Sequence, residues 1–380
     1  MGYLAMPLTA VLALRASPGQ VGLLATLSTS AFLLIGLPAG ARTDRVRKRP
    51  LMIAADLARA VVFGSVPLAW LLRVLTIYQL YGVVLVAGVC TVFFDVAAQS
   101  HLPHLVGRGR LGRANARLVT LGAVTEIGGR GVGGLLVTLV SAPAAIGLDA
   151  ATYLGSAVFL LRVRRPEPRS RHAGTMALRR DIGEGVRYVF GHAVLRPIAL
   201  AGTCTNLAIQ LCQTMLPVVF VRLGLPGGAI GVFFAVGGAG TLLGSLSARR
   251  LARRLGSGRV LWLVGLAIAP TGICVALVDR GPALWLAATA WLLITFKVGV
   301  DNVIKVSFRQ AVTPDRLLGR MNATMRFVLT GALAVGGALA GLLGQFVGVR
   351  AALWAGAVLF ALVWVPTFFS PLRTAQALPN

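Results

Sequence analysis

The sequence has 380 residues, of which 57% are hydrophobic and only 13% are charged, and its mean hydropathy is +0.81. Soluble domains carry about one quarter charged residues, and a water-soluble fold of this length has no interior large enough for so many apolar side chains. The formal net charge of +26 would favour a nucleic-acid partner in a soluble protein, but the composition excludes that class and predicts a membrane protein.

Apolar runs recur along the whole chain, each near the ~20 residues that a helix needs to cross ~30 Å of hydrocarbon. Lipid offers the backbone no hydrogen-bond partners, so these runs are predicted to be helices. The period-two alternation of a membrane barrel is absent from the sequence. We expect about twelve spans, the clearest of them at Gly22–Gly40, Leu51–Leu72, Ile77–Ala98, Ala145–Leu161, Val260–Val278, Ala283–Thr295 with its continuation, and Ala351–Phe369.

The amino end differs from the later runs. Met1–Leu14 is apolar but too short to span a bilayer. We interpret it as the second half of a helix whose start is missing, so the first helix is expected to be truncated. A cleavable signal peptide is not expected, because a basic segment does not precede the apolar run.

Basic residues alternate between the loops. One set of loops is rich in lysine and arginine, including the long polar stretch Arg162–His192, whereas the loops between them hold single arginines at positions 15, 73, 222, 280 and 350. Cytoplasmic loops of membrane proteins carry the excess of basic residues. Both termini and the loop at 162–193 are therefore predicted to lie in the cytoplasm, in a multi-pass protein of a bacterial inner membrane, and a nucleic-acid partner is not expected.

The polar stretch divides the chain into an N-terminal bundle of six helices (1–163), a cytoplasmic linker (164–193) and a C-terminal bundle of six helices (194–380). The two halves are related in sequence. Leu111-Gly-Arg-Ala-Asn-Ala116 matches Leu318-Gly-Arg-Met-Asn-Ala323, and at the same offset Gly129 pairs with Gly336. Internal repeats of this kind build many secondary transporters, with the substrate site between the repeats. We therefore expect two bundles related by a pseudo-twofold axis.

The segment Gly36-Leu-Pro-Ala-Gly40-Ala-Arg-Thr-Asp44-Arg45-Val-Arg47-Lys48-Arg49 resembles the loop signature between helices 2 and 3 of the major facilitator superfamily. Further motifs resemble the branch that contains macrolide-efflux and enterobactin-exporter proteins. They are Asp56-Leu-Ala-Arg59-Ala60, Phe93-Phe94-Asp95, Leu111–Ala116 and Arg309-Gln310…Pro314-Asp315…Leu318-Gly-Arg. The resemblance covers nearly the whole chain and implies an all-α fold of two six-helix bundles that rock about a central site.

Four residues are candidates for gating. Gly40, Asp44 and Arg45 belong to the loop that, by the resemblance, latches the outward-facing state. The alternative is that the basic cluster only sets the topology. Arg59 lies one turn from Asp56 in the third span, and the two side chains form either a gating element or a structural ion pair.

Three residues are candidates for proton coupling. Glu126 and Arg130 are expected at mid-depth in the fifth span, one turn apart, where ionisable groups are costly unless they face a cavity or a partner. Burial raises the pKa of a carboxyl and a nearby cation lowers it, so Glu126 could alternate between Arg130 and a proton. A static ion pair is the alternative. Asp95 in the fourth span is the second candidate.

Five residues are candidates for substrate contact. Asn206, Gln210 and Gln213 fall on one face of the seventh span, where uncharged amides suit a ligand surface or bond to a neighbouring helix. Lys297 and Asp301 lie one turn apart in the tenth span, with Lys305 a turn further. Lys297 could meet an anionic or carbonyl-bearing substrate, whereas a self-contained salt-bridge ladder is the alternative.

The resemblance implies a secondary transporter that exports a hydrophobic or amphipathic small molecule, such as a drug, a macrolide-like compound or a siderophore, by proton antiport. Two alternatives stay open: an importer or facilitator of the same fold, and an inactive paralogue that acts as a scaffold or sensor. The truncated first helix and Arg130, which stands where the family's antiporter motif has proline, favour the second alternative. We expect a monomer in the lipid bilayer.

No cofactor, metal site or enzyme activity is expected. The sequence has no P-loop pattern, so ATP hydrolysis is not supported. Its four cysteines lie inside apolar runs without metal-ligand spacing and are interpreted as packing residues.

Overall fold

The computed structural model describes residues 2–43, 46–106, 132–162 and 178–374, together with residues 118, 121–122, 125 and 128–129. Every regular element in these residues is a helix. Nine of the described helices are long and apolar enough to cross a membrane. The chain forms two compact units, one of residues 1–175 with 226–231 and the other of residues 176–225 with 232–380.

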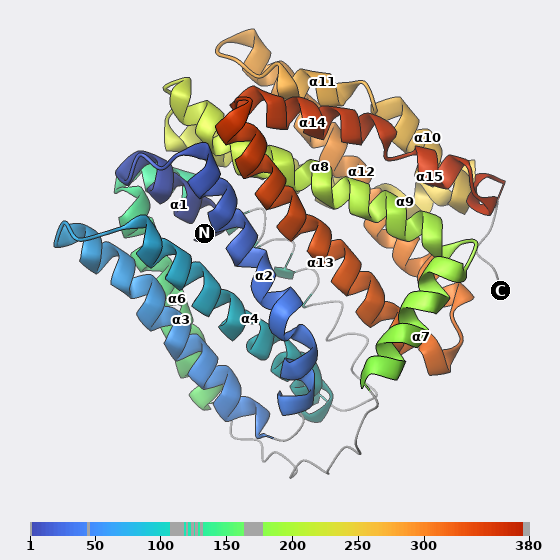
Figure 1. The fold of residues 1–380 in the computed structure, drawn as a ribbon, viewed down its shortest axis with the longest axis horizontal. Coiled ribbons are helices and arrows are strands. Elements are labelled where there is room, and N and C mark those ends of the chain that lie inside the picture. Colours follow the sequence, from blue (N-terminus) through green and yellow to red (C-terminus); the bar gives the residue numbers. More distant parts are fainter. Residues whose placement is uncertain are drawn as a thin grey trace. The chain divides into compact units, whose positions relative to one another are not determined.

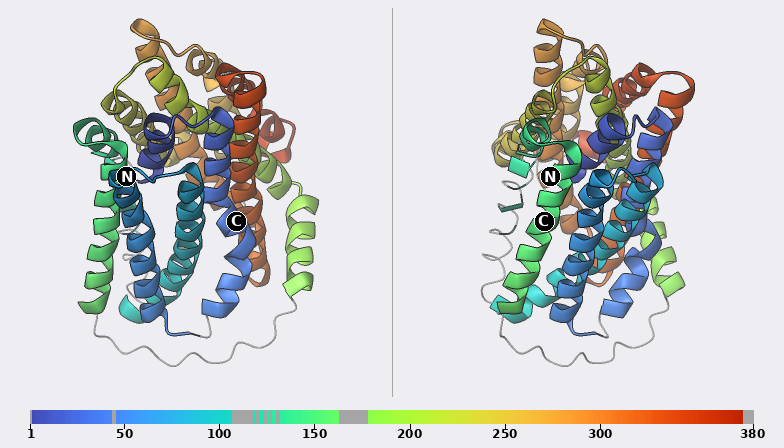
Figure 2. Two further views of the ribbon diagram at one scale, coloured as in Figure 1. Left: turned by 60° about the vertical axis from the view of Figure 1, so that its left-hand side comes forward. Right: turned by 90° about the vertical axis from the view of Figure 1, so that its left-hand side faces the viewer.

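The first unit is a bundle of helices that lie side by side, coloured blue to green in Figures 1 and 2. α3 packs against both α4 and α6, and α2 packs against α4. Residues 132–139 are also helical. The bounds are α1 Gly2–Leu8, a π-helical turn Thr9–Ala13, α2 Pro18–Thr43, α3 Lys48–Leu71, α4 Ile77–Val106 and α6 Ala142–Arg162.

Short polar side chains cap the N-termini of three of these helices, α2, α4 and α6. The Oγ of Ser17 accepts a hydrogen bond from the backbone N–H of Gln20 at 3.3 Å, while the Oε1 of Gln20 accepts one from the N–H of Ser17 at 2.8 Å. This reciprocal arrangement satisfies two donors that a helix start leaves free. Thr76 caps α4 and Ser141 caps α6 through their hydroxyl oxygens. Polar residues therefore delimit the apolar runs that the sequence shows.

The second unit contains the remaining helices, coloured green to red in Figure 1. Gly256, with φ of 91°, makes the turn between α9 and α10, and Pro270 separates α10 from α11. The bounds are α7 Leu178–Gly191, α8 Leu195–Arg222, α9 Gly227–Leu255, α10 Ser257–Ile268, α11 Thr271–Ala276, α12 Pro282–Val312, α13 Asp315–Phe346, α14 Val349–Leu362, α15 Val365–Phe368 and a 3₁₀ turn Pro371–Arg373.

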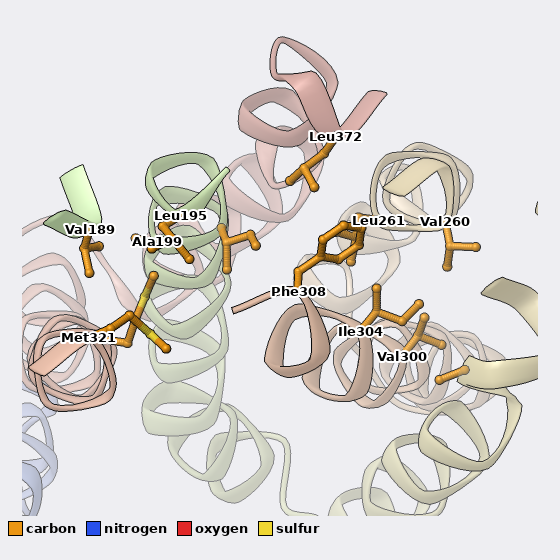
Figure 3. Packing of buried hydrophobic residues seen from close by; sticks show 13 residues of the cluster. Val189, Leu195, Ala199, Val260, Leu261, Val300, Ile304, Phe308, Met321 and Leu372 are labelled. Atoms are coloured by element: carbon orange, nitrogen blue, oxygen red, sulfur yellow. The ribbon is translucent and has the colours of Figure 1, made fainter. Parts of the chain in front are cut away.

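The apolar core of the second unit gathers side chains from α7, α8, α10, α12 and α13. Phe308 of α12 lies beside Leu261 of α10, and Met321 of α13 lies near Leu195 of α8 (Figure 3). All of these side chains are buried. Because interiors of this kind are close-packed, the cluster holds α12 in a fixed position between α8 and α10.

Glycines let α9 and α12 approach closely within the second unit. A Cβ added at Gly244 would collide with the backbone carbonyl of Phe296, and one added at Gly299 would collide with that of Thr241. The hydroxyl of Ser245 also donates to the carbonyl of Gly299 at 3.3 Å. Small residues drive helix association in lipid by this kind of contact, so the glycine-rich face at 237–244 is a packing surface.

Helix α7 lies within the stretch predicted as a linker, and it packs against α13 and α8 (Figure 1). Gly185 faces the carbonyl of Arg320, the hydroxyl of Tyr188 donates to the carbonyl of Val312 at 2.9 Å, and Glu184 forms an ion pair with Arg320 at 2.5 Å. This helix therefore belongs to the second unit.

The seven clearest predicted spans all fall on helices of the structure. The expected total of about twelve exceeds the nine described helices that are long enough. Leu4–Ala13 is helical but short, as is Ser257–Ile268, which Pro270 separates from α11. The span predicted to hold Glu126 and Arg130 is described only in part, at residues 118–139 with gaps.

Candidate functional site

Charged side chains are buried in a spanning helix of each unit. Burying a charge in the membrane is costly unless it is paired or faces a polar cavity. The chemistry of the molecule is therefore expected at these clusters, one on α3 and one on α12.

The cluster of the first unit surrounds Arg59, which is 6% exposed. Its guanidinium forms an ion pair with Asp56 one turn earlier and donates to the hydroxyl of Thr91 at 3.4 Å. The guanidinium carbon also lies 4.6 Å from the ring centre of Phe94 and 4.5 Å from that of Tyr153. Cations at this distance are attracted by aromatic faces, most strongly where water is excluded.

This arrangement ties three helices together. Asp56 and Arg59 come from α3, Phe94 from α4 and Tyr153 from α6. The anion and the cation cancel in charge, and the two rings cover the guanidinium. The ion pair that the sequence suggested is present, and its chemistry is that of a structural link. Its predicted gating role stays a prediction.

Asp95 follows Phe94 on α4 and is half-buried. It lies next to the Arg59 cluster in sequence, and its role in proton coupling stays a prediction. Gly40 lies within α2 near its end. The other predicted residues of the first half, Asp44, Arg45, Glu126 and Arg130, lie outside the described residues.

The cluster of the second unit is a ladder on α12. One carboxylate oxygen of Asp301 accepts hydrogen bonds from the ammonium groups of Lys297, one turn earlier, and of Lys305, one turn later, the latter at 2.8 Å. All three residues are at most 8% exposed. The other carboxylate oxygen of Asp301, Oδ1, is buried without a hydrogen-bond partner among the described residues. The ladder is the alternative that the residue spacing left open.

A pocket of about 60 Å³ lies beside this ladder, between α8, α12 and α13 of the second unit. A site needs about 10–15 Å³ by this measure to hold one water, so the pocket has room for a few waters or a small polar group. Its polar lining consists of Thr205 and Asn206 from α8 and of Asp301, Asn302, Lys305 and Arg309 from α12. Lys297 does not line it, and its side chain instead lies against Gly265 of α10.

The amides predicted on α8 have different surroundings. Asn206 lines the pocket and donates to the carbonyl of Leu329 on α13 at 2.8 Å. Gln210 is buried where α8 meets α13, beside Gly336, and donates to the hydroxyl of Thr214 at 3.1 Å. Gln213 is half-buried one turn further. The structure therefore brings Asn206 and Asp301 together at the pocket and places Gln210 in a helix contact.

Arg309 is the pocket residue that sequence reasoning missed as a site. In the sequence it is recognisable only within the motif Arg309-Gln310…Pro314-Asp315, whereas the structure carries it on α12, which extends to Val312. The spacing of the charged residues could have identified it from the sequence. Residues four apart share a helix face, and the series is Lys297, Asp301, Lys305 and Arg309. Within the described residues, no group of three or more metal-ligating side chains occurs.

Long apolar helices with buried charges and a polar pocket define a polytopic membrane protein of the transporter class. A sequence profile of the Major Facilitator Superfamily matches residues 1–303, and the chain belongs to this family. It is a multi-pass secondary transporter and not an enzyme. The family resemblance and the all-α membrane fold expected from the sequence are thereby confirmed.

Two curated relatives span most of the chain. The multidrug efflux pump Tap of Mycolicibacterium fortuitum is 26% identical over 361 residues, which cover 93% of this chain and 87% of that protein. The enterobactin exporter EntS of Shigella dysenteriae is 24% identical over 332 residues, which cover 86% and 77%.

Two solved structures share the fold. A bacterial homologue of the iron transporter ferroportin in its inward-facing state has a TM-score of 0.73 at 18% identity and covers 97% of this chain and 94% of its own. The nucleoside transporter NupG also has a TM-score of 0.73, at 12% identity, with 97% and 95% covered. At these identities the likeness concerns the fold alone.

Proposed function

We propose that this chain exports a hydrophobic or amphipathic small molecule from a bacterial cytoplasm by alternating access, in exchange for protons. One observation carries the proposal. Two relatives that match most of the chain, a multidrug efflux pump and an enterobactin exporter, both move small organic molecules outward. The protein would lie in the inner membrane with both termini in the cytoplasm, as the basic loops predict.

Proton entry supplies the energy in this proposal. One elementary charge that crosses 100 mV releases about 2.3 kcal/mol. Glu126, with Arg130 one turn away, is the first candidate for the group that is protonated, and Asp95 on α4 is the second. A carboxylate in a membrane helix can bind a proton on one side and release it on the other, because its pKa responds to burial and to a nearby cation.

Substrate contact is proposed for the polar residues of α8 and α12. Asn206 and Asp301 support this best, since they line the same pocket. Gln210, Gln213 and Lys297 are retained as candidates that extend the polar face on either side. Gating is proposed for Gly40 on α2 and for Asp44 and Arg45, which follow α2 in the sequence, with Arg59 on α3 as a further candidate.

The test uses everted membrane vesicles from cells that express the full chain. In such vesicles an exporter moves its substrate inward, so ethidium added outside would accumulate when respiration acidifies the interior. Wild-type vesicles are expected to accumulate ethidium and to lose the activity with a protonophore. The Glu126→Gln variant is expected to lose most of it, because an amide cannot bind and release the coupling proton.

Glu184→Gln is the matched control, because this carboxylate lies on α7, outside the spanning helices, in a half-exposed ion pair. It should transport like the wild type. Accumulation that is unaffected by the protonophore would contradict proton coupling, and normal transport by Glu126→Gln would contradict the assignment of Glu126. If energised everted vesicles that contain the protein hold less ethidium than vesicles without it, the protein is an importer, because an importer moves its substrate out of an everted vesicle. No difference between the two kinds of vesicle would favour a scaffold.

A further inference from the structure

The stretch of α12 from Lys297 to Val312 carries more positive than negative charge, with Lys297, Asp301 and Lys305 buried and Arg309 half-buried. Lys297, Lys305 and Arg309 are cations, and Asp301 is the one anion among the described residues of this helix between positions 297 and 312. Asp301 forms ion pairs with both lysines, so its single negative charge already offsets one of their two positive charges. Two positive charges therefore remain without a counter-charge on the helix. Uncompensated charge in a low-dielectric interior is costly, and an anion would relieve that cost.

Arg309 places part of the excess positive charge of α12 at the wall of the pocket. It lines the pocket with Lys305, and the structure records no ion pair between it and any described residue. Its Nε–H is buried and has no acceptor among the described residues. An unsatisfied buried donor lowers stability. The missing partner is an acceptor, and a guanidinium is suited to a planar oxyanion that it can bind with two hydrogen bonds.

The other walls of the pocket determine what the rest of such a ligand would be. Ile198 of α8 and Met325 and Leu329 of α13 are apolar, as are Val298 and Val306 of α12. Asn302 is exposed, so the pocket is not sealed. A cavity of about 60 Å³ admits the charged end of a molecule but not a whole drug-sized one. The chemistry fits a carboxylate or similar oxyanion attached to an apolar body.

We propose that the pocket between α8, α12 and α13 binds the oxyanion group of an amphipathic organic anion through Arg309 and Lys305, and that such anions belong to the transported substrates. This inference rests on the proposed export function, and it names the substrate class. Asp301 is a positioning residue in it. Held between Lys297 and Lys305, its carboxylate keeps the Lys305 ammonium at the pocket wall.

The binding test compares two probes that differ only in charge, 2-naphthoate and its neutral analogue 2-naphthamide. The full chain is purified in detergent, and its melting temperature is measured from the monomer that remains by size-exclusion chromatography after heating. A ligand that binds the folded state raises this temperature, and the rise grows with the logarithm of its concentration above the Kd. Naphthoate is expected to stabilise the wild type, and naphthamide is expected to have no effect at the same concentration.

The decisive variant is Arg309→Gln, because it removes a charge that has no ion-pair partner in the described part of the chain and so spares the ladder. It should fold, and the naphthoate concentration needed for a given rise in melting temperature should increase about tenfold or more, as for loss of a charge-assisted hydrogen bond. Arg254→Gln is the matched control, since Arg254 is an exposed arginine at the end of α9. It should respond like the wild type. An unchanged response of Arg309→Gln, or equal stabilisation by naphthamide, would overturn the proposal.

A lipid headgroup is the other possible source of the oxyanion. The same melting measurements in nanodiscs of phosphatidylcholine, with and without phosphatidylglycerol, separate the sources. If phosphatidylglycerol stabilises the wild type and Arg309→Gln loses that effect, the site holds lipid and the substrate assignment is overturned. If phosphatidylglycerol leaves the response to naphthoate unchanged, the free organic anion is supported.

This experiment separates the two proposals. Naphthoate binding that depends on Arg309, in a protein whose everted vesicles accumulate neither ethidium nor naphthoate, would leave the site standing and end the export proposal. Proton-driven ethidium accumulation without Arg309-dependent binding would leave export standing and end the anion site.

Discussion

The two units bury charge in different ways. In the first, Arg59 is matched by Asp56, covered by Phe94 and Tyr153, and supported by Thr91. In the second, one carboxylate, Asp301, is shared between two lysines, and Arg309 stands beside them at a pocket. The first cluster is neutral and enclosed, whereas the second has surplus positive charge and adjoins open space.

The difference indicates how to tell a structural ion pair from a site in a membrane helix. A buried charge whose partners come from three helices holds those helices together, and nothing more is required of it. A buried charge that exceeds its partners and adjoins a pocket remains costly until a ligand compensates it. The α3 cluster is therefore a structural link, with gating by Arg59 kept as a proposal, and ligand binding is proposed for α12.

The largest effect is expected when Asp301 is changed to Asn. This change leaves Lys297 and Lys305 buried without a carboxylate, and breaking a buried pair in this way costs about 3–5 kcal/mol. The matched change in the first unit, Asp56→Asn, leaves Arg59 with two aromatic faces and the Thr91 hydroxyl, so about 1–3 kcal/mol is expected. Unfolding in mixed detergent and dodecyl sulfate micelles measures both. Equal losses would contradict the contrast between the clusters.

A smaller effect is expected for Arg59→Lys, which keeps the charge of the first cluster but removes the planar guanidinium. An ammonium cannot lie flat between the rings of Phe94 and Tyr153, and we expect a loss of about 1–2 kcal/mol. The same unfolding measurement applies, with Arg254→Lys as the exposed control. If Arg59→Lys is as stable as the wild type, charge alone accounts for the cluster and the stacking is irrelevant.

Much of this architecture could be predicted from the sequence. The apolar runs gave the helices, because the bilayer imposes one length and one secondary structure on them. The spacing of Asp56 and Arg59, and of Lys297, Asp301 and Lys305, gave the ion pairs, because residues three or four apart are neighbours on a helix. Both pairings depend on local geometry, which a single sequence contains.

The remaining features depend on which helix faces which. The amides of α8 are spaced for one face, but only the structure shows that Asn206 bonds to Leu329 and that Gln210 meets Gly336 on α13. Arg309 is recognisable in the sequence only as part of a family-like motif, and the structure shows that α12 continues past it to Val312 and brings it to the pocket. Helix α7 was assigned to a linker because its sequence is polar, and its packing partners are distant in the chain.

A half-exposed ion pair sharpens the comparison by removing most of the burial. Glu184 of α7 and Arg320 of α13 lie 2.5 Å apart, with side chains 39% and 36% exposed. Exposed pairs contribute about 0.2–1 kcal/mol, so Glu184→Gln should lower stability far less than Asp301→Asn. A double-mutant cycle with Arg320→Gln measures the coupling. If this coupling energy is as large as the loss of stability in Asp301→Asn, the attachment of α7 to α13, rather than the burial of charge, dominates the stability of the second unit.

The smallest effect is expected at the exposed turn before α12. The pKa of Asp279 is lowered by the backbone N–H of Arg280, which donates to its carboxylate at 2.8 Å, and by Arg350, which donates at 3.0 Å. A carboxyl with a lowered pKa stabilises the fold above its unfolded pKa, near ~3.9. That contribution is lost as the pH falls through the folded pKa.

Asp279→Asn should therefore lower the melting temperature slightly and by a constant amount between about pH 5 and 7, with the difference closing as the pH falls below ~3.9. Both charges are half-exposed, so about 1 M salt, where the Debye length is about 3 Å, should reduce the difference as well. Melting curves across pH and salt, with Arg350→Gln as the partner variant, check this. If the difference in melting temperature persists at low pH and high salt, the packing of Asp279 rather than its charge stabilises the turn. The contrast between exposed and buried ion pairs would then not hold for this pair.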